Sequence, residues 1–193
     1  TAGVVQITSN DALGTLSGSQ GTMVASGAAV EISGASALTI PEAFNLNGSG
    51  ISSGGAIRLV GTSAAATLTG GLTAQTASRI NTDATTGTNT LTISTTGITN
   101  TAGITFGVTS AGSINITSAI SGSSTSASNL IKDGSGAGKL ILSTANTYVG
   151  TTSITSGVVQ IQNNTSLGAS GSSGTTISAT GAALEINGYS MAI

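Results

Sequence analysis

Residues 3–7 read Gly3-Val4-Val5-Gln6-Ile7, and the same five residues return as Gly157-Val158-Val159-Gln160-Ile161. Each copy places two apolar side chains two positions apart around a polar one, which is the pattern of a short β-strand with one buried face. The similarity extends over residues 1–39 and 155–193 at a constant offset of 154. A fixed long period is typical of solenoids and fibres. We therefore interpret residues 1–193 as a single solenoid segment of a longer tandem array.

The same alternation recurs along the whole chain. Clusters of Gly, Asn, Ser and Asp separate the apolar pairs, so each strand is only a few residues long. Short strands at regular intervals predict an all-β fold and favour a parallel β-helix, or β-solenoid, of roughly eight coils. A β-sandwich would need longer strands joined by hairpin turns. The triplets are 5–7, 30–32, 38–40, 44–46, 57–59, 91–93, 104–106, 114–116, 140–142, 159–161 and 184–186.

Composition removes several classes of function. Charged residues make up 5% of the chain and aromatic residues 2%, and the net charge is -2. Without a basic stripe or a stacking platform of aromatic rings, we expect no nucleic-acid partner. No apolar run approaches the roughly 18 residues of a membrane-spanning helix, so we expect no transmembrane segment. The recurring Val, Ile and Leu argue against disorder.

Side chains for catalysis are scarce. The chain has no His and no Cys, which excludes Ser-His-Asp and Cys-His sites and any metal site built on those residues. A polysaccharide lyase or hydrolase would need two carboxylates, for which the nearest pair is Glu31 and Glu42, with Asp11 before them. Glu31 recurs as Glu185 in the second copy, which favours a surface feature of the module. We therefore predict no catalytic residue, no cofactor and no metal.

Residues 130–161 contain a more specific pattern. A strand with Lys132, Gly134, Gly136, Leu140 and Leu142 is followed by a corner with Asn146, Tyr148, Gly150 and Thr152, and then by Gly157, Val159 and Ile161. This order resembles the passenger-associated repeat of bacterial autotransporters, also called the autotransporter-associated β-strand repeat, found in large β-helical surface proteins. Residues 55–72 resemble the strand pair that precedes that repeat. The resemblance implies a right-handed parallel β-helix and export to the cell surface, and carries no catalytic residues.

The residues of this motif have predicted structural roles. Asn146 is expected to hold the corner by bonding its own backbone, and Tyr148 to cover the turn with its ring. Gly150 and Gly157 are expected where the backbone needs positive φ or a close approach. Lys132 and Lys139 are expected to face outward as solubilising charges that deter edge pairing.

Three functions remain open at this point. The first is a non-catalytic structural module of a bacterial surface protein, serving as a stalk, an extracellular fibre or a coat. Its partners would be adjacent repeats, or further copies joined through open coil ends or lateral faces. The second is an adhesin whose hydroxyl-rich faces bind a glycan or a host surface. The third is the polysaccharide enzyme. The first two place the protein outside the cell or on the outer membrane surface.

Overall fold

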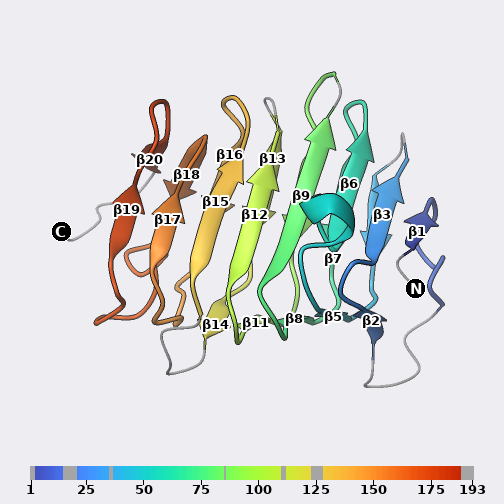
Figure 1. Ribbon diagram of the computed structural model, residues 1–193, viewed down its shortest axis with the longest axis horizontal. Helices are drawn as coiled ribbons and strands as arrows, with labels where there is room; N and C mark the ends of the chain where they lie inside the picture. The colour runs from blue at the N-terminus through green and yellow to red at the C-terminus, as the bar shows by residue number, and fades with distance from the viewer. Residues whose placement is uncertain are drawn as a thin grey trace.

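The computed structural model describes residues 3–14, 21–34, 37–84, 86–109, 112–122 and 128–187. Within them the chain forms twenty β-strands and one short 3-10 turn, η1 (Ile51–Ser53). The strand ladders are parallel and form three sheets wound around a common interior (Figure 1). The prediction of an all-β parallel solenoid is therefore confirmed.

We number the sheets in the order in which the chain visits them. Sheet 1 has eight strands: β1 (Val4–Ile7), β3 (Ala29–Ser33), β6 (Ile57–Gly61), β9 (Ser78–Ala84), β12 (Ile104–Val108), β15 (Leu130–Gly134), β17 (Thr152–Ile154) and β19 (Thr175–Ile177). Sheet 2 has seven: β4 (Leu38–Ile40), β7 (Ala65–Leu68), β10 (Thr90–Ile93), β13 (Ser113–Ile116), β16 (Lys139–Leu142), β18 (Val158–Ile161) and β20 (Ala183–Ile186). Sheet 3 has five: β2 (Thr22–Val24), β5 (Phe44–Leu46), β8 (Leu72–Ala74), β11 (Ile98–Asn100) and β14 (Ile120–Gly122).

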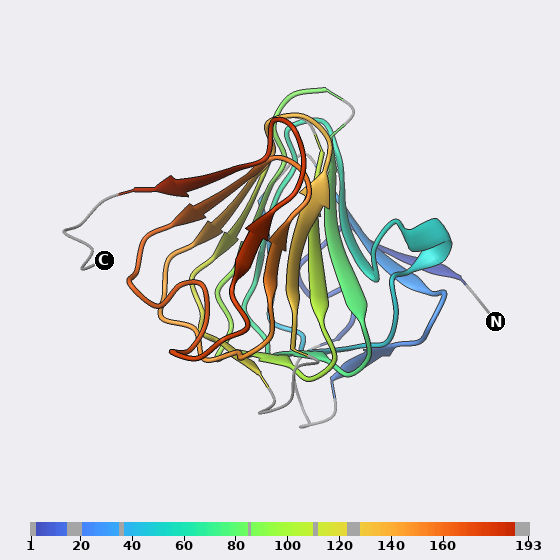
Figure 2. The ribbon, with the colours of Figure 1, turned by 60° about the vertical axis from the view of Figure 1, so that its left-hand side comes forward.

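Each coil passes from sheet 1 to sheet 2 to sheet 3 and then returns one rung further along (Figure 2). The register of sheet 1 gives the coil length, which ranges from 22 residues between Lys132 and Ile154 to 27 between Val30 and Ile57. The eight strands of sheet 1 therefore span about seven full turns, close to the predicted number of coils.

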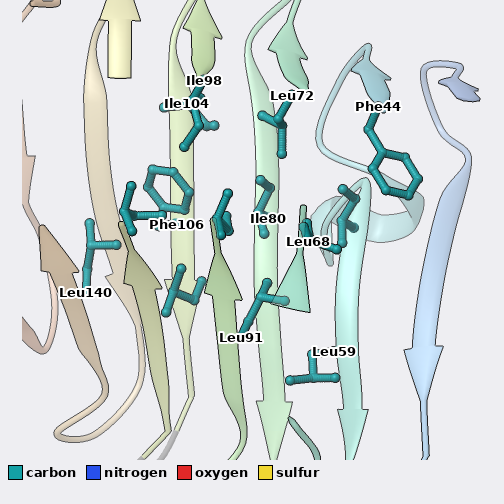
Figure 3. Close-up of a cluster of buried hydrophobic side chains, with 14 of the residues drawn as sticks. Phe44, Leu59, Leu68, Leu72, Ile80, Leu91, Ile98, Ile104, Phe106 and Leu140 are labelled. Carbon is teal, nitrogen blue, oxygen red and sulfur yellow. The ribbon is translucent and has the colours of Figure 1, made fainter. Parts of the chain in front are cut away.

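The interior consists of apolar columns that run along the solenoid axis. One column of sheet 1 stacks Ile57, Ile80 and Phe106, and its residues pair in register on successive strands. Facing columns from sheet 2 include Leu68, Leu91 and Leu140, and sheet 3 adds residues such as Phe44 and Leu72 (Figure 3). Because every coil adds the same few side chains, the core grows in length without growing in width, which suits Ile, Leu and Val.

All eleven predicted triplets lie within strands. In nine of them both outer members are buried, as the alternation predicts. The two exceptions are Val5-Gln6-Ile7 and Leu184-Glu185-Ile186, which belong to the end coils. There a side chain of the correct phase lacks a covering coil on one side.

Candidate functional site

The segment from β15 to β18 is the best-defined unit of the chain. It contains two sheet 1 strands and two sheet 2 strands, with a corner of residues 143–151 between them. Leu140, Leu142, Val159 and Ile161 point into the core and pair as Leu140 with Val159 and Leu142 with Ile161. Within the described residues, no strand occupies the sheet 3 position of this coil, so side chains must hold the corner.

Lys132 lies inside the solenoid, and the prediction of an outward charge was wrong for this residue. Its side chain is fully buried in the apolar column between Phe106 and Ile154. The ammonium Nζ donates to the carbonyl of Asp133 (2.6 Å) and to that of Ser156 (3.1 Å). Desolvation by burial lowers the pKa of Lys132 from 10.5 to about 8; Asp133 opposes this shift and Arg79 adds to it. Lys132 therefore ties the end of β15 to the turn before β18.

Asn146 also links neighbouring coils, and does not bond its own backbone as predicted. Its Oδ1 accepts from the backbone N–H of Ile120 (2.8 Å), and its Nδ2 donates to the carbonyl of Ser166 (2.6 Å). Ile120 lies one coil before this corner and Ser166 one coil after it. One buried amide thus replaces the ladder hydrogen bonds that a sheet 3 strand would supply.

Tyr148 and Thr152 form a buried hydroxyl pair at the same corner. Tyr148 is fully buried, and its hydroxyl lies 2.7 Å from the Oγ1 of Thr152, which is also buried. Burial raises the pKa of the Tyr148 phenol to about 12, although the hydrogen bond with Thr152 acts to lower it. The ring therefore anchors the corner from within.

The glycines of the motif lie where neighbouring chain segments come close together. Gly157 has a φ of 69°, and a Cβ there would lie 2.5 Å from the carbonyl oxygen of Gly138 and 2.8 Å from Lys132 Nζ. Gly150 packs against the backbone of residues 128 and 129. The positive φ at Gly157 and the close approach at Gly150 agree with the prediction. Gly134 and Gly136 adopt positive φ in the turn after β15.

A second polar cluster lies on the outer face of sheet 1. Arg58 contacts Glu31 (2.7 Å) and Asp83 (2.7 Å), on the strands before and after its own. Arg79 reaches over one intervening strand to Asp133 (2.6 Å). That strand carries Gly107 at the crossing point, where a Cβ would overlap the Arg79 guanidinium. We call these five charged residues the sheet 1 ladder.

The sheet 1 ladder combines two cations with three anions that bind across rungs. Arg79 also donates to the Oδ1 of Asn81 (3.2 Å), and Asn81 donates to Asp83. Such an arrangement stabilises strand register, and its charges largely neutralise one another.

The candidate catalytic carboxylates belong to separate polar environments. Glu31 is in the sheet 1 ladder, whereas Glu42 is buried and accepts from the Oγ1 of Thr22 (2.8 Å). Asp11 is exposed in a turn, where its carbonyl accepts from the N–H of Gly14. Lys139, on the outer face, contacts Glu185 at 2.8 Å. Hydrogen bonds from Lys139 and then from Gln160 lower the pKa of Glu185.

Two searches of the described residues were negative. They contain no group of three or more His, Cys, Asp or Glu side chains arranged to hold a metal ion. Nor do they contain a helix long and apolar enough to cross a membrane.

The corner geometry gives the setting for the comparison with known families. The family model of the passenger-associated-transport-repeat matches residues 130–161. This match covers β15 to β18, including Lys132, Asn146 and Tyr148. Together with the β-solenoid fold, it is consistent with the passenger repeats of autotransporters. No curated protein and no solved structure matches the chain.

The sequence did not reveal the serine and arginine contacts that link coils. Ser166 donates to the carbonyl of Leu142 (3.0 Å), one coil back. Arg79 and Asp133 are 54 residues apart. The signal for the second contact is Gly107 within a strand, since a strand glycine often marks a place where another group approaches.

Proposed function

We propose that the chain is a non-catalytic structural module that extends a bacterial surface protein as a stalk, fibre or coat. The single observation that supports this most is the passenger-repeat corner. Its polar side chains, Lys132, Asn146 and Tyr148, are buried and hold neighbouring coils together. Side chains used in this way contribute to a rigid rod and leave no reactive group exposed at the corner.

Several features of the rod support a mechanical role. The ladders are continuous over eight rungs of sheet 1, and the inner columns repeat the same apolar residues at each coil. Each coil contacts mainly its neighbours, so length is added one coil at a time. The passenger-repeat family also suggests an extracellular or surface-exposed protein.

The test is surface display of the chain. We would fuse residues 1–193, with an epitope tag at the N-terminus, in place of the passenger of a bacterial autotransporter. We expect the tag to be accessible to antibody and protease on intact cells, and the displayed chain to extend the cell-surface layer in electron micrographs. Retention of a folded chain inside the cell would contradict the proposal.

An adhesive role is the second candidate, because the outer faces carry uncharged polar columns. Thr39, Thr67, Thr92 and Asn115 lie in register on consecutive strands of sheet 2. Hydroxyl and amide groups repeated at the strand spacing would suit a glycan or another repetitive surface. A glycan array and a cell-binding assay with the displayed chain test this role, and the absence of binding in both would remove it.

A further inference from the structure

The exposed large apolar side chains of the described residues are confined to the two ends of the solenoid. At the N-terminal end they are Val4 (47% exposed), Val5 (54%) and Met23 (73%), on the first strands of sheets 1 and 3. At the C-terminal end they are Ile177 (49%) and Ile186 (64%), on the last strands of sheets 1 and 2. The flanks of the rod expose no comparable side chain within the described residues.

Val5 and Ile177 are the two ends of one inner column. The register places Val5 against Val30 at one end of sheet 1, and Ile154 against Ile177 at the other. Val30 and Ile154 are buried, whereas the two end members are half exposed because each lacks a coil on one side. Each end therefore presents apolar surface of the same kind that packs inside the column.

We propose that the two ends bind one another in different copies, so that a second copy of this chain docks head to tail. In this arrangement Val5 of one copy covers Ile177 of the copy before it, and β1 pairs with β19 to continue sheet 1. This inference rests on the proposed structural function and adds to it the partner and the register. The contact is heterologous and does not close, so it produces filaments.

The two edge strands lack the features that usually prevent such pairing. Natural edge strands are commonly protected by Lys, Pro or inward-pointing charges. The sequences of β1 (Val4–Ile7) and β19 (Thr175–Ile177) contain no charged residue and no proline. Glu185 is the single charge on β20, and Lys139 of the same chain binds it. Neither electrostatic repulsion nor a bulky side chain opposes the docking of β1 on β19.

Cysteine cross-linking tests the register directly, because the chain contains no Cys. If Val5 stacks on Ile177, then Val4 lies beside Thr176, and both side chains are exposed on the outer face. Directly paired residues on neighbouring strands are close enough for a disulfide. We would mix the single variants Val4→Cys and Thr176→Cys, each with a different mass tag, and oxidise them. We expect the mixed dimer to exceed either homodimer.

The matched control replaces Thr176→Cys by Ala183→Cys. If the second copy were rotated by one face, β1 would dock on β20 and Val4 would lie beside Ala183. A mixed dimer that forms with Ala183→Cys and not with Thr176→Cys would overturn the proposed register. Equal yields of mixed dimers and homodimers in all pairs would overturn specific docking.

Association of the unmodified chain provides a second readout. Sedimentation velocity should show a concentration-dependent series of oligomers, and Ile177→Asp should weaken association by about tenfold or more, since it places a carboxylate in the apolar contact. Ser94→Asp, at an exposed position on the flank, should leave association unchanged. A chain that remains monomeric at every concentration contradicts the inference, whereas surface display would still support the proposed function. Failure of display with intact head-to-tail cross-linking would contradict only the proposed function.

Discussion

The two copies of the repeated sequence occupy different faces of the same solenoid. The first copy forms β1 and β3 in sheet 1, whereas the second forms β18 and β20 in sheet 2. Their internal pairing is nevertheless identical: Val4 pairs with Ala29 in the first copy, and Val158 pairs with Ala183 in the second. Local sequence therefore specifies which strands pair and in which register, but does not specify the face on which they lie.

The length of the coils explains this difference. From Val5 to Ile154 the chain makes six coils of sheet 1, and Val159, the equivalent of Val5, lies on the following face. The period of 154 residues is thus six coils plus one face. If further units followed with the same coil lengths, the same surface would return to its starting face after three units.

Equivalent residues of the two copies also differ in burial and partners. Val5 is 54% exposed and Val159 is fully buried, although both belong to the sequence Val-Val-Gln-Ile. Glu31 binds Arg58 on the next rung, whereas Glu185 binds Lys139, two rungs back. Position along the stack, and not the identity of the residue, determines these differences.

The largest expected effect separates Val159 from Val5. Val159→Asp should destabilise the fold by about 4 kcal/mol or more, since it buries an unpaired carboxylate and removes apolar contact. Val5→Asp should cost less than about 1 kcal/mol, because its side chain is already half in solvent. Chemical denaturation measures both values. Hydrogen exchange should show that Val159→Asp weakens β16 to β20 and spares the N-terminal coils. Equal costs for the two variants would contradict the assigned burial.

Lys132 predicts an alkaline rise in stability that involves only the coils beside the second copy. Its folded pKa is about 8 and its unfolded pKa about 10.5, so between these values the unfolded state binds more protons. The free energy of unfolding should therefore increase with pH over this window, by at most about 3 kcal/mol. The raised pKa of Tyr148 has the opposite effect above about pH 10, where the unfolded phenol ionises and the folded one does not. Lys132→Met should remove the rise in denaturation curves collected between pH 7 and 10, and a rise that persists would contradict this account.

Tyr148 and Thr152 test the corner that replaces a sheet 3 strand near the second copy. Tyr148→Phe and Thr152→Val should each destabilise by about 1–2 kcal/mol, because each leaves the other hydroxyl buried without its partner. The double variant should cost less than the sum of the two. A double-mutant cycle in urea measures this coupling, and additive effects would show that the pair does not interact.

The two glutamate contacts should give the smallest effects. Arg58→Gln removes both carboxylate contacts of the first copy and should cost up to about 1 kcal/mol, less at high salt. Lys139→Gln acts on the more exposed pair and should change stability less than Arg58→Gln. Its clearer result is a rise in the pKa of Glu185 toward the ordinary value, measured by NMR titration. An unchanged Glu185 pKa would mean that Lys139 does not bind it in solution.

The sequence predicted strands well where apolar residues were large and alternated. Leu91-Thr92-Ile93 and Ile114-Asn115-Ile116 are examples, and both outer members of each are buried. It missed strands such as β9 (Ser78–Ala84), which is mostly polar because its outer face carries Arg79, Asn81 and Asp83. Gln160 was expected to face water. It occupies an outer position of β18, but Glu185 and Gln162 cover it, so it is 8% exposed.

Lys132 shows why the motif could be located but not fully interpreted. Alternation from the buried Leu130 would have placed Lys132 inside, whereas its charge argued for the outside. The alternation was the better guide, because the carbonyls of Asp133 and Ser156 accept from the ammonium within the fold. Ser156 is 24 residues away, so its carbonyl could not be identified as a partner from local sequence.

By itself the sequence determined the repeat, the short alternating strands and the parallel solenoid, because side-chain alternation is a local property with a period of two residues. Only the tertiary structure decided which face each copy occupies, why Lys132 is inside, and how Arg79 crosses Gly107 to reach Asp133. These features depend on contacts between residues one or two coils apart. Coil lengths of 22 to 27 residues, set by the corners, determine which residues meet.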